Sequence, residues 1–162
     1  MNIFIVDTDP VRAARALCDR HVVKMVLETA QILSTISGGP YRPTHQNHPC
    51  VLWAKASQRN YLWLVEHGQE LGREYTRRYG KVHKSSQVID QLSTPPKSIT
   101  RVGLTPFVQC LPDLYRGPST VEAYRNYYHG EKSHFATWKT QPPQWWVWWP
   151  LQISEILPSS HL

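Results

Sequence analysis

The chain has 162 residues, of which 41% are hydrophobic, and its formal net charge at neutral pH is +6. This length supports one well-buried core and is short for two, so we expect a single domain over residues 1–162. The sequence has no apolar run long enough for a membrane span, no secretion signal and no paired spacing among its three cysteines, which predicts a cytoplasmic protein with reduced thiols.

The first predicted elements are a short apolar segment and a helix. Residues 2–7 read as a strand or as an extended segment that ends at Asp9-Pro10. Asp9 suits an N-cap and Pro10 suits the first helical turn. Helical periodicity then continues, with a break near Cys18-Asp19, to the stop signal at residues 37–40.

Within this region, helical spacing brings polar groups onto one stripe, namely His21, Lys24, Glu28 and Gln31. Apolar side chains fall on the opposite face: Val22, Val23, Val26, Leu27, Ala30 and Leu33. An amine, a carboxylate and an imidazole on one face can perform imine or acid–base chemistry if the stripe lines a cleft. The alternative is a solvated face with an ordinary Lys24–Glu28 pair.

The next predicted helix is the longest, from Pro49 to the glycine at position 80. Its apolar face should pack on the first helix and consists of Trp53, Tyr61, Leu64, Gly68, Leu71 and Tyr75. Between residues 75 and 112 only Asp90 opposes the basic side chains of Arg77, Arg78, Lys81, Lys84, Lys97 and Arg101. Such a positive field attracts polyanions, so nucleic acid is the partner that we expect, with a membrane surface or mere solubility as alternatives.

The remainder of the chain is predicted as loop, one helix and an aromatic tail. Residues 82–118 contain five prolines and read mainly as loop. Ser119 and Glu122 form a capping-box pattern that opens a third helical stretch, with a break near Gly130. Residues 142–150 are rich in tryptophan and bounded by prolines, so we expect an extended strap around the core.

One short segment combines His45, His48 and Cys50, which together could hold a zinc ion. The spacing matches none of the common zinc signatures. We therefore expect His48 to cap or pack within a loop, and we expect no metal and no cofactor.

Several of these segments, taken in order, resemble the pyrimidine-dimer DNA glycosylases of the phage endonuclease V type and their bacterial relatives. The matching segments are residues 19–21, 28–33, 47–49 with Trp53, 74–80, 124–128 and the Trp-Pro near the end. The resemblance implies an all-α fold of three main helices. It also implies removal of a damaged base, cleavage of the strand at the abasic site, and a catalytic glutamate, which Glu28 matches.

The nucleophile departs from the pattern of that family. The phage enzyme uses the α-amino group of a threonine exposed when the initiator Met is removed, whereas Asn2 here predicts that Met1 is retained. The amine can then be that of Met1 or the side chain of Lys24, or Glu28 can activate water without a covalent step. We rank Met1 above Lys24, with water close behind, because an anionic neighbour stabilises the ammonium form of a lysine.

The sequence thus predicts a DNA glycosylase for a damaged or modified pyrimidine, with possible abasic-site lyase activity. The predicted catalytic residues are Glu28, Met1, Lys24 and His21, and the predicted DNA-binding residues are Arg20, Arg77, Arg78, Lys81, Lys84 and Arg125. We expect a monomer that acts on duplex DNA, away from membranes, in the cytoplasm, which is that of the host if a phage encodes the chain. The alternatives are a non-catalytic nucleic-acid-binding protein and a base- or nucleoside-modifying enzyme on the same scaffold.

Overall fold

The chain folds as helices joined by loops, which confirms the all-α prediction; the computed structural model describes residues 1–148, and none of these residues forms a strand. The helices are α1 (Pro10–Ala16), α2 (Asp19–Ser37), α3 (Pro49–Ala56), α4 (Gln58–Tyr79), α5 (Ser86–Gln91), α6 (Thr120–Tyr127) and α7 (Gln144–Val147). A 3₁₀ turn (Asp113–Tyr115) precedes α6 and a π-helical turn (Tyr128–Lys132) follows it. None of the described helices is both long and apolar enough to cross a membrane.

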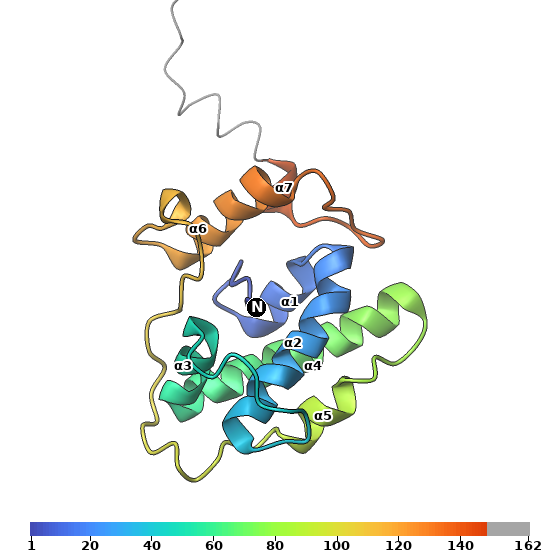
Figure 1. Ribbon diagram of the computed structural model, residues 1–162. Helices are drawn as coiled ribbons and strands as arrows, with labels where there is room; N and C mark the ends of the chain where they lie inside the picture. The colour runs from blue at the N-terminus through green and yellow to red at the C-terminus, as the bar shows by residue number, and fades with distance from the viewer. Residues whose placement is uncertain (149–162) are drawn as a thin grey trace, which may run out of the picture.

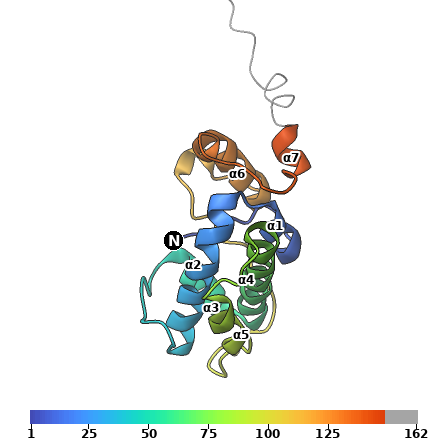
Figure 2. The same cartoon turned by 90° about the vertical axis from the view of Figure 1, so that its right-hand side faces the viewer.

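Helices α2 and α4 form the centre of the fold and pack on each other (Figures 1 and 2). Helix α1 packs on α4, whereas α3 and α5 each contact both central helices. The segment with α6 and α7 lies across one end of this arrangement in both views. The close approach of α2 and α4 depends on Gly68, because a Cβ at this position would lie 2.5 Å from Thr29 Cγ2.

Most helix ends follow the predicted capping residues. Asp9 accepts a hydrogen bond from the backbone N–H of Arg12 and begins α1, and the break at Cys18 separates α1 from α2 as expected. Gly38 ends α2 at φ 86°, a left-handed conformation that glycine adopts without steric cost. Ser119 caps α6 through the N–H of Glu122. These ends are set locally, by one side chain or one backbone conformation.

The prediction of one long helix from Pro49 was wrong, since Ser57 divides it into α3 and α4. Ser57 has extended backbone angles, and its side chain accepts a hydrogen bond from the N–H of Asn60. The Asn60 amide in turn donates to the carbonyl of Trp53, at 2.8 Å. Serine favours this kind of side-chain capping over a helix interior. The break is therefore a capped junction between α3 and α4 that side-chain hydrogen bonds stabilise.

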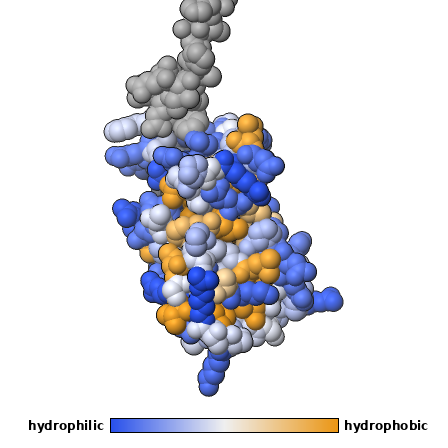
Figure 3. Space-filling model, turned by 90° about the vertical axis from the view of Figure 1, so that its left-hand side faces the viewer, coloured by the Kyte–Doolittle hydropathy of each residue, from blue (hydrophilic) through white to orange (hydrophobic). Residues whose placement is uncertain are grey.

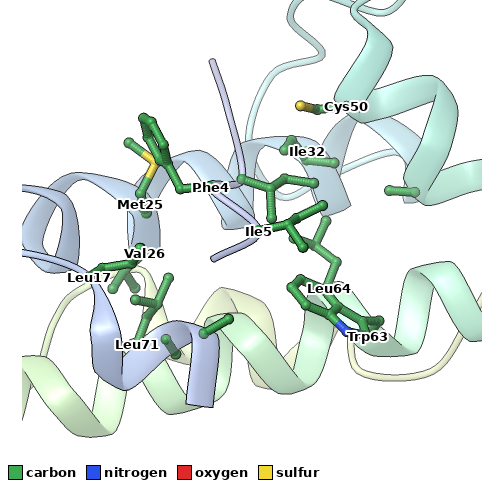
Figure 4. Packing of buried hydrophobic residues seen from close by; sticks show 14 of the residues in the cluster. Phe4, Ile5, Leu17, Met25, Val26, Ile32, Cys50, Trp63, Leu64 and Leu71 are labelled. Atoms are coloured by element: carbon green, nitrogen blue, oxygen red, sulfur yellow. The ribbon is translucent and has the colours of Figure 1, made fainter. Parts of the chain in front are cut away.

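The amino-terminal segment is extended and enters the core. Ile3, Ile5 and Val6 are buried, and in Figure 4 Ile5 lies between Ile32 of α2 and Leu64 of α4. The segment pairs with no strand, so of the two predicted forms the extended one is present. Its burial fixes the position of the first two residues of the chain, which is important for the site described below.

The segment of residues 82–118 is mainly loop, as predicted, but it includes α5, which forms because Val88 and Ile89 are buried against the central helices. Figure 3 shows the face toward which the later part of this segment lies, with apolar residues in small patches separated by hydrophilic ones. The tail, which was predicted to be extended, contains the short helix α7, and Trp146 of this helix stacks on His129. Trp149 and Pro150 lie outside the described residues.

Candidate active site

An amine and a carboxylate meet at the start of the chain. The α-amino nitrogen of Met1 lies 3.8 Å from Oε1 of Glu28, and the backbone N–H of Asn2 donates to Oε2 of Glu28 at 3.3 Å. The Met1 side chain is 4% exposed and that of Glu28 is 12% exposed. The Glu28 carboxylate is therefore partly withdrawn from water, and charge interactions with it are stronger than at an open surface.

The side chain of Asn2 holds this terminus in place. Its Oδ1 accepts hydrogen bonds from the N–H of Ile3 at 2.8 Å and from the hydroxyl of Tyr124 at 2.8 Å. Its Nδ2 donates to the carbonyl of Cys110 at 3.0 Å. The terminus is thus hydrogen-bonded to α6 and to the loop between α5 and α6, and the adjacent Ile3 is buried in the core. The amine is positioned by tertiary contacts that involve residues more than a hundred positions away.

Lys24 lies at the edge of this pair. Its Nζ is 3.9 Å from Oε1 of Glu28, one helical turn away on α2, as the spacing predicted. The Lys24 side chain is 63% exposed, in contrast to that of Met1. Glu28 therefore has two cationic neighbours, the α-amino group of Met1, whose side chain is buried, and the exposed Lys24.

His21, which was predicted to be a catalytic residue on the same stripe, is not accessible on the open face. The His21 ring is buried; it stacks on Phe4 at 4.2 Å between centroids, and its Nδ1 is 2.6 Å from the hydroxyl of Tyr128. Burial lowers the pKa of His21 to about 3, and the nearby charges of Lys132, Lys24 and Arg20 act in the same direction. The amino-terminal segment and the π-helical turn cover this side of α2, which periodicity along one helix cannot reveal. His21 is a neutral residue of an aromatic cluster.

Two apolar residues that were predicted to be on the buried face lie outside. Val23 is 38% exposed and Leu27 is 41% exposed. They share the open side of α2 with the exposed side chains of Arg20 and Lys24. The open face of this helix is therefore mixed apolar and basic.

Arg78, which was predicted to bind DNA, is buried inside the fold. Its guanidinium is fully buried and pairs with Glu74 at 2.9 Å and with Asp19 at 3.1 Å. It also donates to the carbonyls of Arg15 and Leu17, so that it joins α4 to α1 and to the start of α2. A cation with this many internal partners is not available to a phosphate.

Its neighbour Arg77 is partly exposed but belongs to an ion-pair network with Glu70 and Glu74. Burial opposes ionisation of Glu70, but hydrogen bonds from Arg73, Arg77 and Arg15 hold its pKa at about 2. Arg125 is half-buried, donates to the carbonyl of Val6 and lies over the Trp145 ring. Arg77 and Arg125 therefore have structural partners that compete with DNA.

The other predicted DNA-binding residues are exposed and lie near α2. Lys81 and Lys84 are in the turn after α4, and His83 between them contacts the carbonyl of Val23 at 3.0 Å. Arg20 is exposed on α2 and lies over the Phe135 ring, at 4.3 Å. The turn and α2 thus bring basic side chains to the side of the helix that carries Lys24.

The third group beside the amine is a cluster of His48, Cys50 and Cys110. A ring nitrogen of His48 and the two sulfur atoms all lie within 4.8 Å of one another. The Nδ1 of His48 accepts a hydrogen bond from the N–H of Cys50 at 3.1 Å, which is the cap of α3 that the sequence predicted. Burial and the Met1 ammonium lower the pKa of His48.

Sequence reasoning missed Cys110, which is 62 positions from His48 and separated from it by three helices. The hydrogen bond from the Cys50 thiol lowers the pKa of Cys110, and the Met1 ammonium and Arg116 act in the same direction. The same hydrogen bond, together with burial, raises the pKa of Cys50. No signal in the sequence pairs these two cysteines.

Comparison with known proteins gives one match. The family model described as pyrimidine dimer DNA glycosylase matches residues 1–88, which include Met1, Lys24, Glu28 and His48. Searches of curated proteins and of solved structures returned no match. The matched region is more than half of the 162 residues and contains the amine–carboxylate pair. The chain belongs to the pyrimidine dimer DNA glycosylase family.

Proposed function

We propose that the chain excises a damaged or modified pyrimidine base from duplex DNA as a monomer, with the α-amino group of Met1 as nucleophile and Glu28 as catalytic carboxylate. The observation that carries this proposal is the contact of 3.8 Å between the Met1 amine and the partly buried Glu28 carboxylate in a member of this family. An amine at C1′ of the sugar and a carboxylate beside it are the two groups that such chemistry needs.

The proposed reaction begins when the Met1 amine, in its unprotonated form, attacks C1′ and the bond from C1′ to the base breaks. Positive charge develops on the sugar as the base departs with the electron pair, and the Glu28 carboxylate stabilises this charge. Loss of a proton from nitrogen and opening of the sugar ring then give an imine. Elimination of the 3′ phosphate from the imine would cut the strand, which is the proposed lyase activity.

Lys24 is the less suitable amine because it is exposed and its ion pair with Glu28 stabilises the charged form. We propose that Lys24 contacts the DNA backbone beside Glu28. The N–H of Asn2 is also within reach of Glu28, at 3.3 Å. Removal of Met1 would therefore leave a new amine facing the same carboxylate.

The proposed DNA path follows the open side of α2. Arg20, Lys24, Lys81 and Lys84 are exposed there, and Val23 and Leu27 are partly exposed between them. Phosphate contacts from the basic groups would position the duplex with C1′ of the damaged nucleotide near Met1. Glycosylases must turn their target out of the base stack, and apolar side chains at the surface can fill the vacated space.

Borohydride trapping tests the nucleophile. The full chain is incubated with ultraviolet-irradiated duplex DNA and borohydride, and the covalent adduct is mapped by peptide mass spectrometry. An adduct on the α-amino group of Met1 supports the proposal. An adduct on Lys24, on a processed terminus at Asn2, or base release without any adduct would overturn the assignment of Met1. The absence of base release from a panel of modified and irradiated DNA would contradict the glycosylase function itself.

A further inference from the structure

The thiol of Cys110 lies in a setting that favours reaction with electrophiles. It is half-buried, whereas Cys50 and Cys18 are fully buried, so solvent reaches only one of the three cysteines. The sulfur is 3.6 Å from Nε2 of His48 and hydrogen-bonds with the thiol of Cys50. Two hydrogen-bonding groups thus point at one accessible sulfur.

The hydrogen bonds of His48 show which atom carries the proton. A backbone N–H can only donate, so Nδ1 of His48, which lies 3.1 Å from the nitrogen of Cys50, must be the acceptor. The neutral ring then has its proton on Nε2, the atom that faces Cys110. This N–H stabilises a thiolate. A metal ion would instead need a lone pair at Nε2, and metal-bound histidines usually donate from their other nitrogen.

Positive charge near the Cys110 sulfur also stabilises its thiolate. The Met1 ammonium and Arg116 both act on Cys110 and favour its anionic form. Cys50 is within 4.8 Å and has a proton to supply, which makes it suitable as the second thiol of a pair. The cluster therefore contains an accessible thiolate, a proton donor and a resolving thiol.

We propose that Cys110 is a modification site at which a hydroperoxide oxidises the sulfur and Cys50 then closes a disulfide. The Cys110 thiolate attacks one oxygen of hydrogen peroxide and becomes a sulfenic acid as the O–O bond breaks, and the other oxygen leaves as hydroxide, which takes up a proton to give water. An alkyl hydroperoxide would release the alcohol instead. The Cys50 sulfur then forms a bond to the Cys110 sulfur, and the hydroxyl leaves with the Cys50 proton as a second water. Each thiol pair is oxidised by two electrons, and one hydroperoxide is reduced.

The pair is linked to the proposed catalytic amine through Asn2. The carbonyl of Cys110 accepts the hydrogen bond that holds the Asn2 side chain, and Met1 directly precedes Asn2 in the chain. Disulfide formation brings the two sulfurs from within 4.8 Å to about 2 Å, so the Cys110 side chain must move next to the carbonyl that holds Asn2. This consequence rests on the proposed function: oxidation should reduce adduct formation at Met1, and reduction should restore it.

The test uses the reduced full chain and two readouts that do not depend on DNA. At neutral pH, Cys110 should react with iodoacetamide about tenfold faster than the cysteines of the urea-unfolded chain. Hydrogen peroxide should yield a Cys50–Cys110 disulfide in a non-reducing peptide map and leave Cys18 as a free thiol. Ordinary reactivity of Cys110, or peroxide treatment without this disulfide, would overturn the proposal.

Variants separate the roles of the two thiols. Cys50→Ser should accumulate a sulfenic acid on Cys110 that dimedone captures, and the matched control Cys18→Ser should still form the disulfide. A stoichiometric zinc ion that the purified chain retains and that Cys110→Ser loses would make the three groups metal ligands and overturn the proposal. If the disulfide forms while borohydride trapping on DNA is unchanged, the link to the amine is wrong. A reduced chain that never traps on DNA contradicts the proposed function, while the disulfide map still decides the modification site.

Discussion

Acidification should destabilise the folded chain through His67 in the middle of α4. The side chain is fully buried and its ring stacks on Trp63 at 5.0 Å between centroids. Neither ring nitrogen has a hydrogen-bond partner within residues 1–148. Burial lowers the pKa of His67 to about 3 in the folded chain. The unfolded chain binds this proton near pH 6.5, which is the ordinary value for histidine.

Because the folded state holds the proton less tightly, the unfolded state binds more protons over the interval between these two pKa values. Stability is therefore complete above about pH 6.5 and falls as the pH decreases toward 3. By linkage, His67 alone should remove about 2 kcal/mol from the free energy of unfolding between about pH 7.5 and about pH 5. His21, with a pKa of about 3, should contribute a similar loss.

The comparison with His67→Phe isolates this contribution, because phenylalanine retains a ring beside Trp63 and has no proton to bind. Urea unfolding followed by tryptophan fluorescence gives the free energy of unfolding of both proteins at both pH values. The wild type should lose about 2 kcal/mol more than the variant. Any packing change caused by the larger ring is the same at both pH values and cancels. Equal losses in the two proteins would refute the reasoning.

Three further outcomes follow from the packing and charge of named residues. Gly68→Ala should cost about 2 kcal/mol, because the new Cβ would lie 2.5 Å from Thr29 Cγ2, and Thr29→Ser should recover most of this loss; equal urea-denaturation losses in both backgrounds would contradict the steric explanation. Arg78→Met should cost about 3 kcal/mol in thermal unfolding, because it leaves buried carboxylates unpaired; an unchanged Tm would show that the pairs contribute nothing. Replacing Lys81 and Lys84 by alanine should lower the slope of log affinity against log salt by about two units, and an unchanged slope would place the DNA elsewhere.

The sequence predicted most accurately the features that depend on contacts within one helical turn. Asp9, Gly38 and Ser119 end or begin helices through contacts with residues at most four positions away, and each was predicted correctly. The Lys24–Glu28 pair belongs to the same class of contact. Ser57 also acts locally, but the apolar periodicity on both sides of it concealed the break.

Predictions that needed tertiary partners were less successful. The burial of His21 depends on Phe4 and Tyr128, which come from two distant segments. Arg78 looked like the exposed end of a basic helix, but α1 and α2 cover it. Cys110 lies near the Met1 amine because of the path of the loop between α5 and α6, and no periodic pattern in the sequence predicts this path. Solvent exposure of a titratable group is set by what packs over it, and one helical wheel cannot show that.

The most direct test of the central claim is single-turnover base release from irradiated duplex DNA by the wild type and by Glu28→Gln. If the Glu28 carboxylate stabilises charge on the sugar, the rate should fall by about a hundredfold or more. DNA affinity should stay equal or increase, because a negative charge is removed. Lys24→Gln is the matched control on the same helix face and should weaken binding while retaining the adduct on Met1. A Glu28→Gln rate equal to that of the wild type would contradict the account.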